Sequence, residues 1–372
     1  MPRFAALDVG TNTVLMAVAE RGPDGRLRAV LEREEITRLG EGVDRTRRLL
    51  PQALERTVAV ISRFAEEARE QGVSAFAACA TSAARDATNG SELLALVRER
   101  ARIELEILGG DDEARLVFRA VQEDFGTGAP ALVAIDIGGG STEVVWGPAR
   151  GAPAFHQSVN VGSVRLTERF VTGHPIPEAE RRAIRAHVRE AFSGVPSPPS
   201  GTRAVAVAAT ATTLSAITSL LGARARGASS AARGDIGTPA MEEAPAGSAS
   251  SAPTSASAEL GTPTSVDPPA RVAPGGSRSA EMCRASGSDP AARFAPLRLP
   301  ALEALAETLS GMSLDERSRL EGLDPRRADV LCAGAYILIE ALERLGTAEC
   351  QVSDRGVRWG LLWERFGPDT TY

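Results

Sequence analysis

The stretch FAALDVGTNTVLMAVAE, Phe4 to Glu20, returns in a second version, LVAIDIGGGSTEVVWG, between Leu132 and Gly147. In each version an apolar run ends in an aspartate, Asp8 or Asp136, and a turn of Gly, Ser, Thr or Asn leads into a second apolar run. Apolar runs bounded by such turn residues are typical of a strand, a tight turn and a second strand. The sequence therefore predicts two β-hairpins of one design.

The two hairpins agree in chemistry along their whole length. Placing Asp8 on Asp136 also places Gly10 on Gly138, Thr13 on Ser141 and Met16 on Val144. A single Asp-x-Gly turn is a weak signal, because many hairpins carry Asp and Gly for turn geometry alone. The pair of turns favours a duplicated βββαβα-type domain, with phosphate or nucleotide bound between its halves.

The turn residues suit the binding of an anion. Without bulky side chains several backbone N–H groups can converge on one anion, and hydroxyl groups add further donors. The strand-end aspartates supply hard oxygen ligands for Mg²⁺, usually through water. The candidate phosphate-binding residues of the two loops are Gly10, Thr11, Asn12, Thr13, Gly138, Gly139, Gly140 and Ser141.

Composition sets limits on the class of protein. The 372 residues suffice for two domains, and a hydrophobic fraction of 43% is ordinary for a soluble globular protein. No apolar run approaches the roughly 20 residues that span a bilayer, and the chain opens directly on a strand-like run. We therefore expect a cytoplasmic protein without a membrane partner. The net charge of −6 argues against nucleic acid as a partner.

All 42 basic residues are arginine. A P-loop is excluded, since it requires a lysine. Cationic side chains that recognise phosphate here must be guanidinium groups.

Strand-like and helical stretches alternate to about Gly222, which indicates an α/β protein. The predicted elements include helices at Pro51 to Gln71, Asp111 to Asp124 and Arg327 to Leu345, and strands at Phe76 to Ala80 and Arg102 to Leu108. The Gly/Pro break FGTGAP before the second hairpin predicts two domains, 1–126 and 127–372. Residues 223–293 are rich in Ala, Ser, Gly, Pro and Thr without periodicity. Such a segment cannot bury enough apolar area to offset its chain entropy, so we expect a disordered insertion.

Eight ordered blocks resemble the Ppx/GppA family of exopolyphosphatases and guanosine pentaphosphate phosphohydrolases, within the actin, Hsp70 and sugar kinase superfamily. The blocks are LDVGTNTVLM (Leu7 to Met16), ATSAARDATN (Ala80 to Asn89), ILGGDDEARL (Ile107 to Leu116), IDIGGGSTE (Ile135 to Glu143), NVGSVRLTERF (Asn160 to Phe170), ATATTLSAI (Ala209 to Ile217), DPRRADVLCAGA (Asp324 to Ala335) and VSDRGVRWGLL (Val352 to Leu362). The resemblance covers nearly everything outside the insertion.

The resemblance implies two actin-like (ribonuclease H-like) domains around a central cleft. It also implies Mg²⁺ or Mn²⁺ as cofactor, inorganic polyphosphate or guanosine pentaphosphate as substrate, and a homodimer. The family's catalytic base lies in a block that matches GGDDEAR here, which points to Glu113. The alternative for Glu113 is simple macrodipole complementarity in an acidic first helical turn. Glu143 is a second catalytic candidate and, with Asp8 and Asp136, a metal ligand, because strand alternation should turn it into the cleft.

Further candidates carry positive charge or open a helix. Arg85 follows a strand and can reach a phosphate, the alternative being a surface ion pair with a neighbouring aspartate. Gly162 and Ser163 precede a helix with Arg165 nearby, a plausible anion-binding N-terminus. Arg326 and Arg327 are candidates for nucleotide or chain contacts, or else a solvated charge run.

One block departs from the family pattern. Where the family often has two glycines, this chain has Ala208 and Ala209. Alanine resists a positive φ by about 1–2 kcal/mol, which disfavours a close approach of backbone to ligand there.

The sequence thus predicts a Mg²⁺-dependent phosphohydrolase that releases terminal phosphate from polyphosphate, from guanosine pentaphosphate, or from both. Two alternatives stay open. A small-molecule kinase of the same superfamily shares the duplicated loops, and a non-catalytic sensor would bind an alarmone without releasing phosphate.

Overall fold

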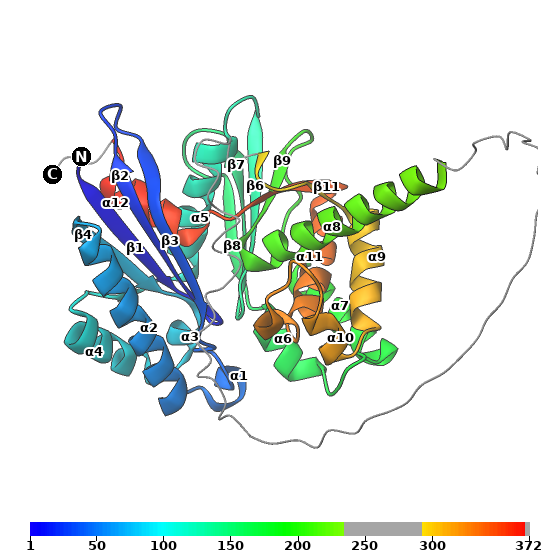
Figure 1. Ribbon diagram of the computed structural model, residues 1–372, viewed down its shortest axis with the longest axis horizontal. Coiled ribbons are helices and arrows are strands. Elements are labelled where there is room, and N and C mark those ends of the chain that lie inside the picture. Colours follow the sequence, from blue (N-terminus) through cyan, green and yellow to red (C-terminus); the bar gives the residue numbers. More distant parts are fainter. Residues whose placement is uncertain (234–291, 369–372) are drawn as a thin grey trace, which may run out of the picture.

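Two β-sheets face each other across a layer of two helices in the computed structural model, which describes residues 1–233 and 292–368 (Figure 1). The first sheet has the strand order β3-β2-β1-β4-β5. Its strands are β1 (Arg3–Val9), β2 (Thr13–Arg21), β3 (Leu27–Ile36), β4 (Val73–Ala80) and β5 (Glu106–Ile107). The order β8-β7-β6-β9-β11 in the second sheet repeats it, with β10 added at the edge. The strands are β6 (Ala131–Ile137), β7 (Thr142–Pro148), β8 (Phe155–Val159), β9 (Arg203–Val207), β10 (Leu297–Arg298) and β11 (Glu349–Ser353).

The predicted hairpin duplication is confirmed down to its register. β1 and β2 pair antiparallel with Leu7 opposite Met16, and β6 and β7 pair with Ile135 opposite Val144. Both turns close in the same way, since the N–H of Gly10 donates to the carbonyl of Thr13 at 2.9 Å and that of Gly138 to Ser141 at 3.0 Å. One design therefore builds both phosphate-loop candidates.

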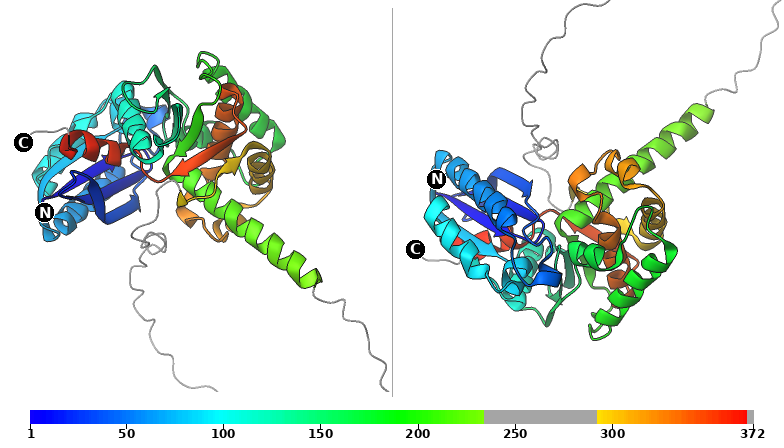
Figure 2. Two further views of the ribbon diagram at one scale, coloured as in Figure 1. Left: turned by 90° about the horizontal axis from the view of Figure 1, so that it is seen from above. Right: turned by 90° about the horizontal axis from the view of Figure 1, so that it is seen from below.

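Helices cover the outer face of each sheet (Figures 1 and 2). Those of the first sheet are α1 (Val43–Thr46), α2 (Pro51–Glu70), α3 (Ser82–Asp86) and α4 (Gly90–Ala101). Those of the second are α6 (Ser163–Phe170), α7 (Glu178–Ala191), α8 (Ala208–Arg233), α9 (Leu299–Ser310), α10 (Leu314–Ser318), the 3-10 turn η3 (Pro325–Arg327) and α11 (Leu331–Leu345). Each outer face has its own core of buried apolar side chains.

The third core lies between the sheets and is built on α5 (Gly110–Phe125) and α12 (Val357–Phe366). The two helices cross at Gly360, where a side chain has no room: a Cβ would lie 2.0 Å from the carbonyl oxygen of Leu116. At its far end α12 stacks Phe366 on Phe4 of β1, with ring centroids 4.4 Å apart. The inner helices thus join the two sheets into one body.

The inner helices correct the predicted division of the chain at residue 126. The strands of the two sheets do fall on either side of that residue. The C-terminal helix α12, however, contacts β1, β2 and β4, so residues 357–366 pack with the first half rather than the second. The cause is the crossing itself, because α12 buries its apolar face in the core that both sheets share.

Three element predictions also change. The helix α8 continues to Arg233, so residues 223–233 of the expected disordered insertion are helical; residues 234–291 lie outside the described residues. The strand expected at Arg102 to Leu108 shrinks to β5, because Arg102 takes a left-handed φ of 54° at the end of α4. The helix expected from Arg327 begins at Leu331, after the η3 turn. Within the described residues, no helix combines the length and apolar character needed to cross a membrane.

Substituting Gly360 by alanine should push α5 and α12 apart. We expect Gly360→Ala to lower the free energy of unfolding by about 3 kcal/mol, since a methyl group has to enter a filled helix crossing. Chemical denaturation measures this change. Gly194→Ala is the matched control, because a Cβ there meets nothing within 4 Å. Equal stability of the two variants would contradict the assigned crossing.

Candidate active site

Strand alternation turns three acidic side chains into the layer between the sheets. In β1, Leu7 and Val9 pack in the outer core, whereas Phe4 and Ala6 pack in the inner one. Asp8 has the parity of Phe4 and Ala6 and is 9% exposed. In the second sheet Asp136 has the inner parity, and Glu143 lies directly opposite it on β7. Both are buried.

The inner helices begin beside these strand ends. Glu113 lies in the first turn of α5 and is buried, which simple macrodipole complementarity at a solvated helix end does not explain. Gly356 caps α12, and a Cβ on it would lie 3.4 Å from an oxygen of Asp136. The fold thus gathers Asp8, Glu113, Asp136 and Glu143 in one buried region.

Burial and mutual repulsion raise the pKa values of these four carboxyl groups. The pKa of Asp8 rises to about 7 through burial and the nearby Glu113. The pKa of Asp136 rises to about 8 through burial and the charges of Glu113 and Asp8. Burial raises the pKa of Glu143 well above its ordinary value, with Glu113 and Asp136 adding to the effect. The site is therefore short of positive charge.

Glu113 is held by Arg85, on α3. The Arg85 Nη1 donates to Glu113 Oε2 at 3.0 Å and to the carbonyl of Leu108 at 2.8 Å. Burial raises the pKa of Glu113, while Arg85 and a hydrogen bond from Thr81 act in the opposite direction. Arg85 pairs here with the candidate base rather than with a neighbouring aspartate.

A pocket of about 490 Å³ opens beside this pair and is lined from both halves of the chain. It is bounded by Arg85, the start of α5 (residues 109–112) and the end of β8 with the turn after it (His156, Gln157, Ser158 and Asn160). Ser158 donates to Glu143 Oε1 at 2.7 Å. The pocket therefore lies next to both Glu113 and Glu143, and an anionic group in it can reach Arg85.

The two loops touch each other at their tips. A Cβ on Gly139 would lie 2.9 Å from Thr11 Cβ, and one on Gly140 would lie 2.4 Å from the hydroxyl of Ser82. Asn12 accepts at its carbonyl from the N–H groups of Thr37 and Arg38, at 3.0 and 2.9 Å. Hydrogen bonds thus support the first loop. The close contact between the two loops requires Gly139 and Gly140, because a side chain at either position would collide with Thr11 or Ser82.

The start of α6 does not present free donors to an anion. The N–H of Ser163 donates to the carbonyl of Gly138 at 3.0 Å, and those of Val164 and Arg165 donate to Gly139 at 2.9 and 3.0 Å. Gly162 is pressed against the same loop, since a Cβ there would lie 2.4 Å from Gly139. In this conformation Gly162 and Ser163 support the second loop, and the N–H of Ser163 is used within the protein. Their anion-binding role stays a prediction.

Arg326 and Arg327 differ in their surroundings. Arg326 donates to Asp324 at 2.9 Å in an exposed ion pair. Arg327 is buried, contacts Thr13 Oγ1 at 3.4 Å and pairs with Glu34. Burial lowers the pKa of Arg327 to about 10. Arg327 thus contacts the first loop, whereas the side chain of Arg326 pairs with Asp324 instead.

The carboxylate cluster suits a divalent cation in its chemistry. Asp8 Oδ1 is buried without a hydrogen-bond partner, and hard oxygen ligands in a site short of positive charge are what Mg²⁺ prefers. Among the residues that the structure describes, no three acidic, histidine or cysteine side chains already enclose a metal position. The carboxylate oxygens thus suit Mg²⁺ as ligands, but they are not already arranged around one metal position.

A family model described as the Ppx/GppA phosphatase family matches residues 17–232 and 294–367. The chain belongs to the Ppx/GppA phosphatase family. Exopolyphosphatase 2 of Mycobacterium tuberculosis is 35% identical over 229 residues, covering 58% of this chain and 71% of that protein. The crystal structure of the Aquifex aeolicus Ppx/GppA family member superposes with a TM-score of 0.67 at 25% identity, over 98% of this chain and 97% of that one. An exopolyphosphatase from Cytophaga hutchinsonii shares the fold, with a TM-score of 0.70 at 21% identity over 97% and 96% of the two chains.

Sequence reasoning missed Arg358, in the first turn of α12. Arg358 is buried and counteracts the rise in the pKa of both Asp8 and Asp136. It pairs with Glu32 of β3 at 3.4 Å. Its block, VSDRGVRWGLL, matches the Ppx/GppA pattern, but no spacing rule in the sequence brings residue 358 to residues 8 and 136. An arginine in a strand-to-helix turn within a matched block was the available signal.

Ala208 occupies the position where Ppx/GppA members often have glycine, and it adopts a φ of 69°. The expected conflict is therefore real: the backbone keeps the left-handed conformation, and the alanine bears the strain. Ala209 is not among the residues with positive φ. The first position demands a glycine-like backbone, and the second does not.

Restoring the glycine should stabilise the protein. We expect Ala208→Gly to raise the free energy of unfolding by about 1 kcal/mol, the relief of left-handed strain exceeding the added chain entropy. Ala209→Gly, one residue later in the helix, should lower it by about 0.5–1 kcal/mol. Parallel urea titrations compare the two, and a loss of stability in both variants would refute the strain.

Without divalent cations, stability should fall as pH rises from about 5.5 to about 8.5. Folded Asp136 keeps its proton to about pH 8, whereas the unfolded side chain loses it near 3.8. In that window the folded protein binds more protons than the unfolded chain, so raising the pH favours unfolding. Asp136→Asn, which cannot ionise, should shrink the difference in Tm between the two pH values in chelator.

The exposed Asp112, in the first turn of α5, provides the control. Asp112→Asn should leave the pH dependence of Tm unchanged. An Asp136→Asn protein with the wild-type pH dependence would show that Asp136 is not the group responsible.

Proposed function

We propose that this protein hydrolyses the terminal phosphoanhydride bond of inorganic polyphosphate and releases orthophosphate, with Mg²⁺ as cofactor. The observation that carries the proposal is the buried carboxylate cluster beside a pocket that both halves line and that contains Arg85. Family membership supports hydrolysis of phosphate bonds. Relatives named exopolyphosphatase support polyphosphate as the substrate.

Hydrolysis of a phosphoanhydride needs a positioned water, donors for the non-bridging oxygens and neutralisation of developing charge. Glu113 is suited to orient and deprotonate the water, because its pKa is raised and it lies beside the pocket. Asp8, Asp136 and Glu143 would hold Mg²⁺, or Mn²⁺ in its place. The cation would supply the positive charge that these carboxylates lack and that the phosphoryl oxygens need.

Arg85 has two tasks in this mechanism. Its Nη1 fixes Glu113 and is itself fixed by the carbonyl of Leu108. Because a guanidinium group has five N–H donors in one plane, Arg85 can keep Glu113 in place while it donates to a phosphate oxygen. The backbone of the two loops, Gly10 to Thr13 and Gly138 to Ser141, would bind the remaining oxygens, with Arg327 next to Thr13.

Guanosine pentaphosphate presents the same terminal bond and belongs in the same assay. The pocket beside Arg85 is lined by polar residues and glycines, including Gln157 and Asn160. These side chains do not distinguish a polyphosphate chain from the phosphates of a nucleotide. Polyphosphate is the proposed substrate because two mycobacterial relatives, exopolyphosphatase 2 and exopolyphosphatase 1, are named for it.

The deciding measurement is phosphate release with Mg²⁺ from polyphosphate and from guanosine pentaphosphate. We expect Glu113→Gln to lower kcat by about 10²–10⁴-fold, since it removes general-base catalysis, and to change KM little. Glu123→Gln, the same substitution at an exposed position of α5 outside the pocket lining, should retain wild-type kcat.

Three results would overturn the proposal. A Glu113→Gln protein with near-wild-type turnover would remove Glu113 from the mechanism. Nucleotide binding without phosphate release would favour the sensor, and phosphate transfer to an acceptor other than water would favour the kinase.

A further inference from the structure

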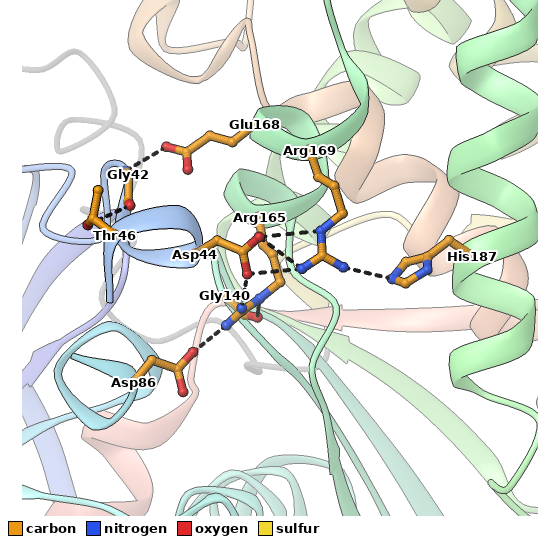
Figure 3. Close-up of polar contacts among 9 residues, drawn as sticks. All are labelled: Gly42, Asp44, Thr46, Asp86, Gly140, Arg165, Glu168, Arg169 and His187. Carbon is orange, nitrogen blue, oxygen red and sulfur yellow. Dashed lines mark hydrogen bonds and ion pairs between the residues drawn. The ribbon is translucent and has the colours of Figure 1, made fainter. Parts of the chain in front are cut away.

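Arg165, on α6, lies where three segments from both halves of the chain meet. It is 9% exposed, although its side chain is charged. Figure 3 shows its guanidinium group between Asp44 of α1, Asp86 of α3 and the backbone of Gly140 in the second loop. Burying such a group is costly unless each polar atom has a partner.

Each guanidinium nitrogen of Arg165 has a different partner. The Nε donates to the carbonyl of Gly140 at 2.7 Å, Nη1 pairs with Asp44, and Nη2 pairs with Asp86. Asp44 and Asp86 belong to the first half of the chain, and Gly140 belongs to the second. A planar fork can satisfy three separate acceptors, which a lysine ammonium cannot do in the same geometry.

The contacts of Arg165 enclose the place where the two loops touch. A cavity of only about 10 Å³ remains there, lined by Thr11, Ser82, Gly139, Gly140 and the side chains of Asp44, Asp86 and Arg165 among others. That volume holds about one water molecule at most. A substrate phosphate therefore cannot lie between the loop tips in this conformation.

Asp86, which pairs with Arg165, is also the neighbour of Arg85 in the chain. Asp86 follows Arg85 directly in α3, and Arg85 holds Glu113 at 3.0 Å. Fixing Asp86 thus restrains the short helix that carries the arginine of the active site. Arg165 thus bonds directly to the second loop, and through Asp86 it restrains the helix whose Arg85 holds Glu113.

We propose that Arg165 is the positioning residue of an ion-pair latch, formed with Asp44 and Asp86, that holds α3 and the two touching phosphate loops in register. The latch joins the two halves where the loop tips touch. Substrate enters and phosphate leaves through the open pocket beside Arg85, while the latch keeps the loop backbone aligned. Only the kinetic part of this inference rests on the proposed phosphohydrolase function.

Neighbouring contacts surround the latch without reaching the loops. Arg169, one turn further along α6, donates to Asp44 at 2.8 Å and contacts His187 at 3.4 Å (Figure 3). Glu168 accepts from the N–H of Gly42 at 3.0 Å. Arg169 is 39% exposed and has no contact with Gly140 or Asp86 among the hydrogen bonds and ion pairs of the described residues. Arg169 is thus a matched control for Arg165.

Hydrogen exchange of the two loops tests the latch without reference to activity. We expect Arg165→Ala to speed amide exchange at least about tenfold in both loop segments, residues 10–14 and 138–142, because both depend on the same clamp. Arg169→Ala should leave both segments near wild type. Arg165→Lys should give an intermediate rate, since it keeps the charge and loses the fork.

Two exchange patterns would overturn the latch. Faster exchange in Arg165→Ala confined to α6 and residues 138–142 would reduce Arg165 to a local structural residue of the second half. Unchanged exchange in both loops would remove its positioning role altogether. Either result can be read even in a protein that releases no phosphate, so failure of the latch and failure of the proposed function are distinguishable.

A double-mutant cycle on kcat/KM provides the second test. Arg165→Ala should lower kcat/KM about 100-fold, because misplaced loops lose the reactive alignment, while Arg169→Ala should change it less than about threefold. Adding Asp86→Ala to Arg165→Ala should cost little more, since both remove the same contact. Additive losses would mean that the two residues act independently in their own halves, which contradicts the latch.

Discussion

The crossing of α5 and α12 is the constraint on which the rest of this molecule depends. Gly360 lets the two helices approach until its Cα faces the carbonyl of Leu116, and no larger residue fits. Each helix then packs against both its partner and a sheet, so the inner core belongs to neither half alone. Because the helices begin beside the ends of β1 and β6, the same crossing decides where Glu113 and Arg358 lie.

That arrangement brings buried carboxylates close enough to repel one another. Asp8, Asp136, Glu113 and Glu143 share a buried region, and the charge of Glu113 raises the pKa of each of the other three. Arg85 and Arg358 offset only part of the repulsion. The proposed Mg²⁺ would neutralise the charge that these carboxylates share. The strain at Ala208 is a second, smaller cost, borne by the backbone between β9 and α8.

Local signals explain which parts could be predicted. The hairpins around Asp8 and Asp136 follow from turn chemistry and period-2 alternation, both of which are written in consecutive residues. The helix at Pro51 and the acidic start of α5 could also be predicted from consecutive residues. By contrast, Gly162 and Ser163 have the composition of an anion-binding helix start, yet the N–H groups of Ser163, Val164 and Arg165 donate to the carbonyls of Gly138 and Gly139. Composition cannot say which acceptor a donor meets.

By itself the sequence determined the duplicated hairpins, the family and the candidate carboxylates, because each depends on residues close together in the chain. Only the tertiary structure decided that α12 returns to the first sheet and brings Arg358 to Asp8 and Asp136. It also decided that Arg165 joins Asp44, Asp86 and Gly140, and that Arg327 reaches Thr13. Apart from the pair Arg165 and Gly140, which are 25 positions apart, these contacts join residues roughly 80 to 350 positions apart in the chain. Such pairs are brought together only by burial of a shared core.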